Sequence, residues 1–140
     1  MTSNLISHGD SRTDDGRWRS IVADLAFWSV VGAIAATVSG PLGDWWHAPQ
    51  AVLIAGGLAF VVAGVILLFG LNRQRPISRS LVRAFGLSNL VVALIAWPAA
   101  LFGWFPLSGP GKWALAVAGG VALALGVWQL STVRRSPHHQ

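Results

Sequence analysis

Cysteine is absent from this 140-residue chain, and charged residues make up only 11% of it. The absence of cysteine excludes disulfides, thiolate metal sites and thiol nucleophiles. Soluble domains carry about 25% charged residues, whereas 54% of the residues here are hydrophobic. These two deficits argue against thiol-redox chemistry and favour a lipid environment for the chain.

Four apolar segments occupy residues 21–38, 51–71, 84–102 and 113–133. Each is close to the roughly 20 residues that a helix needs to cross about 30 Å of hydrocarbon. The second segment contains no polar side chain, whereas an amphipathic helix of a soluble protein shows a polar stripe. The sequence therefore predicts an all-α fold, an integral membrane four-helix bundle with antiparallel up-down topology.

Basic residues are distributed unevenly between the connections. The base Lys112 lies just before the fourth apolar segment, and the other nine bases lie before the first segment, between the second and third, or after the fourth. Arginine-rich loops stay cytoplasmic, so we expect both termini and the middle loop to be cytoplasmic, in a bacterial plasma (inner) membrane. The nine are Arg12, Arg17, Arg19, Arg73, Arg75, Arg79, Arg83, Arg134 and Arg135.

The domain organisation follows from the same pattern. Residues 20–133 are predicted to form one four-helix domain, and residues 1–19 and 134–140 to be disordered cytoplasmic tails, because they are polar and lack periodicity. The net charge is +5, but its placement indicates topology and attraction to lipid headgroups. We therefore expect the lipid bilayer, and no nucleic acid, as a partner.

The stretch GDWWHAPQ, residues 43–50, joins the first two apolar segments on the side opposite the arginines. Trp45 and Trp46 fit an aromatic belt at headgroup level, and Asp44 and His47 are interpreted as solvated residues of this outer interfacial loop. A metal site there would need further ligands. Asp44 with His47 is the single candidate catalytic dyad, and no nucleophile accompanies it. We expect no enzyme activity, no metal and no cofactor.

Few polar side chains lie inside the apolar segments, and they gather toward the cytoplasmic side. We expect Asp24 to pair with Arg83, with Asn89 and Gln129 bonding nearby, because an unpaired carboxylate in hydrocarbon costs about 2–3 kcal/mol. The cluster has two interpretations: an ion pair that fixes helix packing, or a proton- or cation-linked substrate site. A transporter normally has polar groups near the midplane as well, and the outer halves of the helices are almost purely apolar.

Small residues recur at four-residue spacing in three of the segments, a pattern that lets helix backbones approach closely in lipid. The motifs RSIV and RSLV, at residues 19–22 and 79–82, support the hypothesis of a duplicated helical hairpin. The small residues are Gly32, Ala36 and Gly40, then Ala55, Ala59 and Ala63, and then Ala114, Ala118, Ala122 and Gly126.

An alanine-rich helix, the run RQRP and the stretch LVRAFGLSNLVVALIAW follow one another within residues 51–130. In this order they resemble small four-helix membrane proteins of high-GC, actinobacterial-type bacteria, and the layout is loosely similar to DoxX-like proteins. The resemblance implies a multi-pass membrane protein and implies no activity. The chain is similar to small multidrug resistance transporters in size, helix count and an acid in the first helix, but it has Asp24 where that family has Glu.

Two functions remain open at this stage. The close-packing small residues and the near absence of catalytic groups favour a structural or accessory component. It would act by lateral helix contacts with a larger membrane-protein partner or with a second copy of itself. The alternative is a small proton- or cation-coupled transporter that uses Asp24.

Overall fold

The computed structural model describes residues 2–135, and side chains from residue 11 onward. This part of the chain is helical and contains no strand. Four of the helices are long and apolar enough to span a membrane, which confirms the predicted all-α class and indicates a multi-pass membrane protein. The helices are α1 (Thr2–Thr37), α2 (Ser39–Trp46), α3 (Gln50–Arg73), α4 (Arg79–Phe102) and α5 (Gly109–Arg134).

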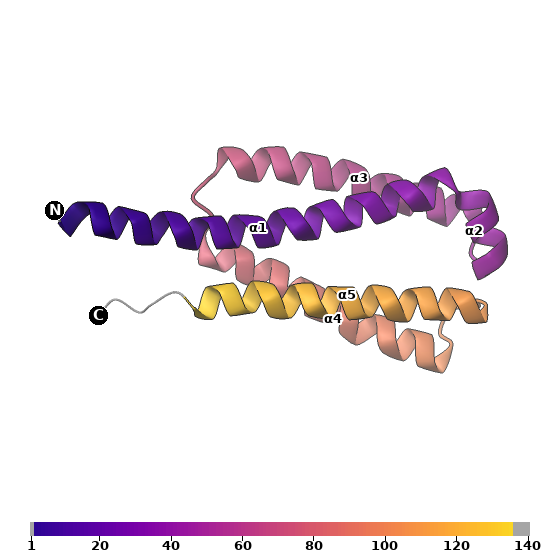
Figure 1. The fold of residues 1–140 in the computed structure, drawn as a ribbon. Helices are drawn as coiled ribbons and strands as arrows, with labels where there is room; N and C mark the ends of the chain where they lie inside the picture. The colour runs from indigo at the N-terminus through magenta and orange to yellow at the C-terminus, as the bar shows by residue number, and fades with distance from the viewer. Residues whose placement is uncertain (1, 136–140) are drawn as a thin grey trace.

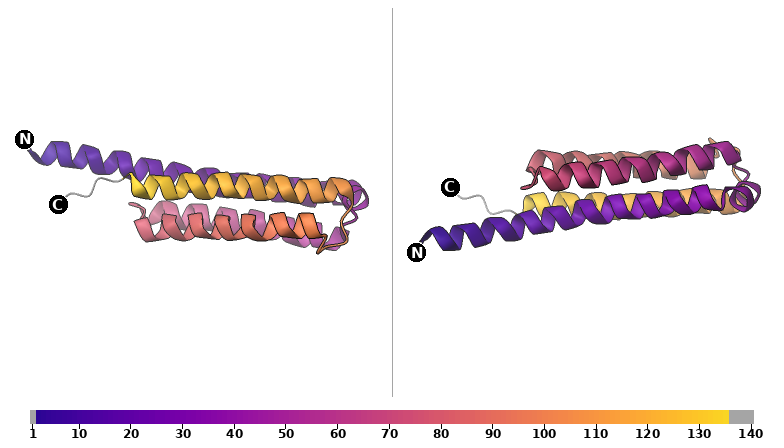
Figure 2. Two further views of the ribbon diagram at one scale, coloured as in Figure 1. Left: turned by 90° about the horizontal axis from the view of Figure 1, so that it is seen from below. Right: turned by 90° about the horizontal axis from the view of Figure 1, so that it is seen from above.

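The four long helices run side by side in an elongated bundle, and both chain ends lie at the same end of it (Figures 1 and 2). Helix α1 packs closely against α3, and α4 packs closely against α5. The two pairs meet mainly where α1 contacts α5. Over their full described lengths, the backbones of α3 and α4 stay apart. Near the Arg-rich end, however, Leu71 of α3 and Val82 of α4 belong to one buried apolar cluster.

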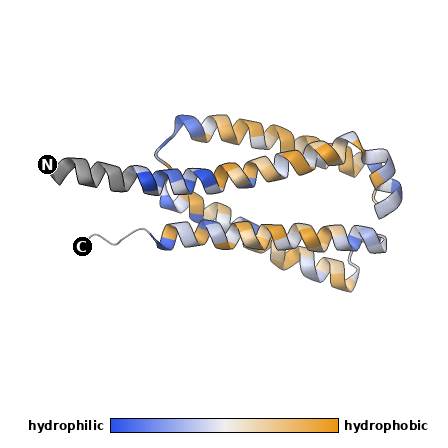
Figure 3. Ribbon diagram, viewed as in Figure 1, coloured by the Kyte–Doolittle hydropathy of each residue, from blue (hydrophilic) through white to orange (hydrophobic). Residues whose placement is uncertain are grey.

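Hydropathy separates the two ends of the bundle (Figure 3). One end, called here the Arg-rich end, holds the chain termini and the connection between α3 and α4, and with them the nine arginines. The opposite Trp-rich end holds α2 and the connection between α4 and α5, with Trp45, Trp46, Trp104 and Trp113. The predicted placement of the nine arginines on a single side of the apolar segments is therefore seen in the fold.

Local sequence fixes the ends of α4 and α5. Ser78 precedes α4 and its side chain accepts a hydrogen bond from the Leu81 backbone N–H at 3.3 Å. Ser108 does the same for α5, from the Gly111 N–H at 3.2 Å. Such caps satisfy N–H groups that have no partner within the helix. Gly103 ends α4 with a φ of 64°, a left-handed conformation that glycine adopts without steric cost.

The polar N-terminal stretch differs from its prediction. Disorder was expected up to residue 19, but α1 begins at Thr2. The reason is tertiary: Asp14 accepts hydrogen bonds from the Ile77 backbone N–H at 2.6 Å and from Arg75 at 2.8 Å. The Arg75 guanidinium also lies 5.2 Å from the centre of the Trp18 ring. At the other end of the chain, α5 reaches Arg134, and the predicted tail beyond residue 135 lies outside the described residues.

The connection between α1 and α3 at the Trp-rich end also differs, because the short helix α2 takes the place of part of the predicted loop. Pro41 is tolerated there because it lies in the first turn, where backbone N–H groups have no partner within the helix. His47 ends α2 in the left-handed conformation, with a φ of 54°. Ser108 ties α2 to the start of α5, since its N–H donates to the Trp46 carbonyl at 2.9 Å and its hydroxyl to the Trp45 carbonyl at 2.5 Å.

Glycines set the closest helix approaches. A Cβ added to Gly32 of α1 would lie 2.6 Å from the Gly57 carbonyl oxygen of α3, and one added to Gly126 of α5 would lie 2.9 Å from the Gly86 carbonyl oxygen of α4. Two of the predicted small-residue positions, Gly32 and Gly126, are thus at helix interfaces. The predicted series in the second segment is wrong, because α3 uses Gly57 and Gly64 against α1, while Ala55, Ala59 and Ala63 are exposed.

The hairpin duplication remains a hypothesis. The run AGG occurs at residues 55–57 and again at 118–120, so Gly57 and Gly120 would be counterparts in the two copies. Yet an added Cβ at Gly120 meets nothing within 4 Å, while Gly119 packs against Trp97. The two pairs thus share glycine-mediated packing but not the same contact positions.

Candidate functional site: a buried carboxylate bonded by two amides

One polar cluster lies in the interior of the bundle. The Oδ2 atom of Asp24 accepts a hydrogen bond from Asn89 Nδ2 at 2.6 Å and another from Gln129 Nε2 at 2.7 Å. Asn89 Nδ2 also donates to Gln129 Oε1 at 3.1 Å. The three side chains come from α1, α4 and α5, and their exposed fractions are 3%, 5% and 0%. The cluster therefore ties together the three helices that supply it.

The cluster lies within the apolar part of the helices, near the Arg-rich end. Gln129 precedes Arg134 by five residues, which corresponds to about 8 Å along a helix. Asn89 follows Arg83 by six residues, or about 9 Å. The carboxylate is thus beneath the level of the arginines, in a region that hydrocarbon surrounds if the bundle spans a membrane.

The expected ion pair between Asp24 and Arg83 is not formed. Arg83 is exposed, and the ion pairs among the described residues join Arg75 to Asp14 and Asp15. The reason is helical geometry: six residues separate Arg83 from Asn89, which places the two side chains about 120° apart around α4. When Asn89 faces the interior, Arg83 cannot. The structure brings Asp24, Asn89 and Gln129 together and leaves Arg83 outside.

The second carboxylate oxygen of Asp24 has a different environment. Its Oδ1 atom accepts no hydrogen bond from the described residues. Asp24 lines a cleft of about 230 Å³ between α1, α3 and α4, in the space between the separated backbones of α3 and α4. A carboxylate that accepts hydrogen bonds at one oxygen alone keeps acceptor capacity at the other, for a further donor or for a cation.

Aromatic side chains form much of the wall of this cleft. Trp28 of α1 and Phe60 of α3 stack with ring centres 5.7 Å apart and planes 21° apart, and Phe85 of α4 also lines the cleft. Ser88 is a lining residue too, but its hydroxyl donates to the Ala84 carbonyl at 2.8 Å. Sequence reasoning missed the three aromatic residues, because apolar residues in a membrane helix look alike whether they face lipid or a cleft.

The residues singled out in the outer loop lie at the opposite end of the bundle. Asp44, Trp45 and His47 are exposed, and Trp46 is half-buried. Within residues 11–135, no three side chains of the kinds that bind metal ions lie close enough together to hold one. Asp44 and His47 therefore form no site with the Asp24 cluster.

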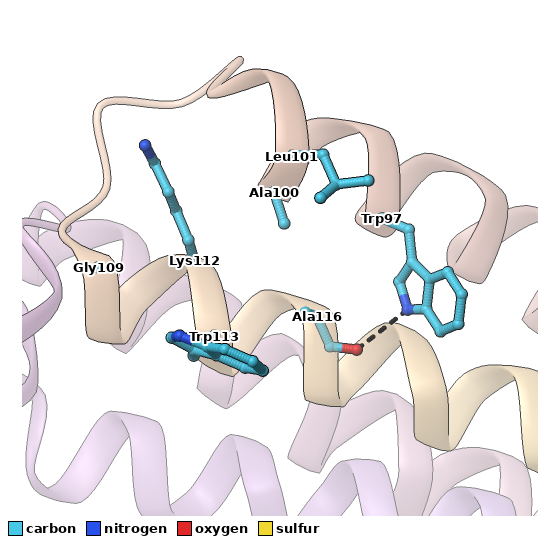
Figure 4. Close-up of a pocket in the computed structure, with 7 residues that line it drawn as sticks. All are labelled: Trp97, Ala100, Leu101, Gly109, Lys112, Trp113 and Ala116. Atoms are coloured by element: carbon cyan, nitrogen blue, oxygen red, sulfur yellow. Dashed lines mark hydrogen bonds between the residues drawn. The ribbon is translucent and has the colours of Figure 1, made fainter.

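A second cleft, of about 340 Å³, lies between α4 and α5 near the Trp-rich end (Figure 4). The Trp97 indole N–H donates to the Ala116 carbonyl across it, at 3.1 Å. Lys112 points away from Trp97 and lies close to Gly103, at the C-terminus of α4, where a cation is favourable. The cleft is otherwise lined by apolar side chains, so it offers shape but no polar chemistry. Its lining residues are Trp97, Ala100, Leu101, Gly109, Lys112, Trp113 and Ala116.

The fold and the cluster define a class: a multi-pass membrane helix bundle with a small polar core and a lateral cleft. No protein-family model, no curated protein and no solved structure matches this chain. The likeness to small four-helix bacterial membrane proteins therefore remains an expectation from the sequence.

Proposed function

We propose that the protein is a structural or accessory membrane component that binds a larger membrane protein through the open face of α3. Among the spanning helices, α3 has its close backbone approach with α1 alone, and only 11% of its most apolar stretch is buried. A helix with so much apolar surface has room for lipid or for a partner helix.

The observation that supports a partner helix is a second row of small residues on α3. Gly56, Ala63 and Gly70 are spaced by seven residues, so they share one face of the helix. Ala63 lines the cleft, and a Cβ added to Gly56 or Gly70 would meet nothing within 4 Å. Small residues let a neighbouring helix approach closely in lipid. This row, called here the open small-residue row, is left uncovered, whereas α1 covers Gly57 and Gly64.

A co-purification experiment tests this function. The tagged protein is extracted from its native membrane in a mild detergent, and native mass spectrometry identifies what remains bound. We expect a stoichiometric partner that is lost in the double variant Gly56→Leu, Gly70→Leu. Val65→Phe is the matched control, because Val65 lies nine residues after Gly56 and thus on the opposite, exposed face of α3.

Two outcomes would overturn the proposal. One is recovery of the wild-type protein alone, as a monomer. The other is loss of the partner in Val65→Phe as readily as in the double variant, which would show that the open small-residue row is not the contact. If the experiment instead recovers a homo-oligomer that the double variant disrupts, the open small-residue row is still the interface. The partner is then a second copy of this chain and not a larger membrane protein.

The proposed orientation places the Arg-rich end in the cytoplasm, in a bacterial plasma membrane. The arginine distribution supports it, because positively charged loops are retained on the cytoplasmic side. The chain has no cysteine, so any maleimide labelling of a single-cysteine variant comes from the introduced residue. We expect Gln74→Cys to be protected from a membrane-impermeant maleimide in intact cells, and Gly109→Cys to react. The reverse pattern would contradict this orientation.

A second candidate function, a proton- or cation-coupled transporter, is favoured by one observation: Asp24 lines a cleft between the helices, and its Oδ1 atom accepts no hydrogen bond from the described residues. Intramembrane carboxylates often mark ion or substrate pathways. Coupled flux in liposomes that disappears in Asp24→Asn would support it, and its absence with the wild-type protein would exclude it for the substrates assayed.

A further inference from the structure

We infer that a third cleft, between α1 and α5 at the Arg-rich end, binds the headgroup of an anionic phospholipid that carries two phosphate groups. The cleft has a volume of about 380 Å³ and shares no lining residue with the cleft beside Asp24. The inference concerns a lipid ligand, so it does not depend on which candidate function is correct. The lining includes Arg12, Gly16, Arg19, Trp128, Thr132 and Arg135.

Helix periodicity brings a row of residues from each helix to this cleft. Arg12, Gly16 and Arg19 are spaced by four and then three residues, so they share one face of α1. Trp128 and Arg135 are also seven residues apart, at the end of α5. The start of α1 and the end of α5 lie at the same end of the bundle (Figures 1 and 2). Arg12 and Arg135 therefore lie at the outer end of the cleft, and Arg19 and Trp128 nearer the apolar part.

The charge of the cleft is the first reason to expect a phosphate ligand. Three of the lining residues are arginines, and no described acid lines the cleft. The nearby acids Asp14 and Asp15 are bonded to Arg75 instead. Within residues 11–135, none of the three lining arginines forms an ion pair. Because guanidinium groups bind phosphate oxygens with two parallel hydrogen bonds, this cleft favours a ligand with more than one negative charge.

The length of the cleft favours two phosphates on one molecule. Seven residues separate Arg12 from Arg19, which corresponds to about 10 Å along a helix, more than a single phosphate group spans. Gly16 lies between them, and a Cβ added there would meet nothing within 4 Å, so the helix surface leaves space for a headgroup. Deeper in the bundle, Gln129 Nε2 donates to Asp24 Oδ2 at 2.7 Å and thereby holds α5 beside α1.

The inner end of the cleft favours a lipid over a soluble phosphate compound. Trp128 belongs to the fourth apolar segment and is 42% exposed, and tryptophan is enriched where headgroups meet acyl chains. In a membrane the arginines would therefore lie at the level of the lipid phosphates and Trp128 at the level where the acyl chains begin. Basic pockets between membrane helices bind the headgroups of lipids of this kind.

The test compares two lipids with the same acyl chains. Dioleoyl-phosphatidylglycerol carries one phosphate, and tetraoleoyl-diphosphatidylglycerol carries two on one headgroup. Native mass spectrometry of the purified full chain in an uncharged detergent gives the Kd of each lipid. We expect the two-phosphate lipid to bind at least about tenfold more tightly. Equal affinity for the two lipids would overturn the inference, and so would binding of the deacylated headgroup, bis(glycerophospho)glycerol, as tightly as the lipid.

Two double variants locate the site. Arg12→Gln with Arg135→Gln removes two lining charges, and we expect at least about tenfold weaker binding of the two-phosphate lipid. The matched control, Arg73→Gln with Arg134→Gln, removes the same charge from the same end of the bundle, but neither residue lines the cleft. We expect the control to change the Kd by less than about twofold, because salt screens distant charges. An equal loss in both would show general attraction and overturn the site.

A third variant tests the cleft without changing its charge. Gly16→Leu places a side chain in the open space between the two rows, and we expect at least about fivefold weaker binding because the side chain obstructs the headgroup. The four substituted arginines are exposed, so we expect every variant to fold, and a thermal melt in the same detergent checks this. Unchanged binding in folded Gly16→Leu would overturn the location of the site.

Discussion

The two closely packed helix pairs are held together by different kinds of contact. In the α1/α3 pair the closest approach is between Gly32 and Gly57. Among the described side chains, no hydrogen bond links the spanning segment of α1 to that of α3. In α4/α5 a glycine contact is reinforced by the Asn89–Gln129 hydrogen bond and by the Trp97 bond to the Ala116 carbonyl, each at 3.1 Å. One pair depends on shape alone, and the other on shape and hydrogen bonds.

This difference separates a polar-linked core from a peripheral helix. Asp24 joins α1 to α4 and α5 by hydrogen bonds, whereas α3 supplies no polar atom to the cluster. Close packing is the main source of helix association in lipid, so it suffices to hold α3 in place. The helix held by shape alone is also the helix with the open small-residue row and one wall of the cleft.

The largest expected effect comes from adding one methyl group at the α1/α3 contact. Gly57→Ala places a Cβ against the Gly32 carbonyl oxygen, and because backbone cannot move aside we expect a loss of about 3 kcal/mol in unfolding free energy. Gly56→Ala is the neighbouring control: its Cβ meets nothing within 4 Å, so we expect a gain of up to about 1 kcal/mol from helix propensity. Unfolding by detergent titration measures both. Effects of the same sign would show that Gly57 is not the contact.

The next effect comes from removing one amide from the core. Gln129→Leu leaves Asp24 with one hydrogen bond fewer and Asn89 with Asp24 as its remaining acceptor in the cluster, and we expect a loss of about 2 kcal/mol in the same titration. Val127→Leu, on the exposed side of α5, is the control and should be neutral. A loss of less than about 0.5 kcal/mol for Gln129→Leu would mean that the cluster contributes little, as some membrane hydrogen bonds do.

A smaller effect is expected in the half of the α4/α5 pair nearer the Trp-rich end. Trp97→Phe removes the indole N–H that donates to the Ala116 carbonyl, and the loss should be about 1 kcal/mol or less because the site is exposed. Trp113→Phe is the comparison, since Trp113 is 75% exposed. If both variants unfold at the same detergent concentration as the wild type, packing of Gly119 and Ala122 alone accounts for the contact between α4 and α5 in this half of the pair.

The smallest effect is local and lies at the Arg-rich end. Arg75→Gln breaks the contacts with Asp14 and Asp15, and we expect faster amide hydrogen exchange over residues 11–19 with little change in global stability. The hydrogen bond that Arg75 donates to Asp14 raises the pKa of Arg75. A raised pKa stabilises the fold at all pH values below the ordinary arginine range, and that stability is lost only at higher pH. Exchange should therefore not vary between about pH 6 and pH 9 on account of Arg75, whereas added salt should speed it.

The sequence predicted the members of the polar cluster but not the partners of Asp24 within it. Asp24, Asn89 and Gln129 stand out because polar residues are rare within apolar segments. Arg83 stood out for the same reason, but its place on the helix face excludes it from the interior. The helical turn at α2 and the contact of Asp14 with Ile77 depend on residues distant in sequence, so no local pattern could indicate them.

The sequence by itself determined the environment: four helices long enough for a membrane, with nine arginines gathered at one end. Hydropathy and loop charge are properties of local segments, which is why they can be read along the chain. Only the tertiary structure decided that α3 and α4 stay apart and that a cleft opens beside Asp24. The choice between Gly56 and Gly57 as the contact turns α3 by about 100°. The residues of an apolar helix face do not indicate whether lipid or another helix covers that face.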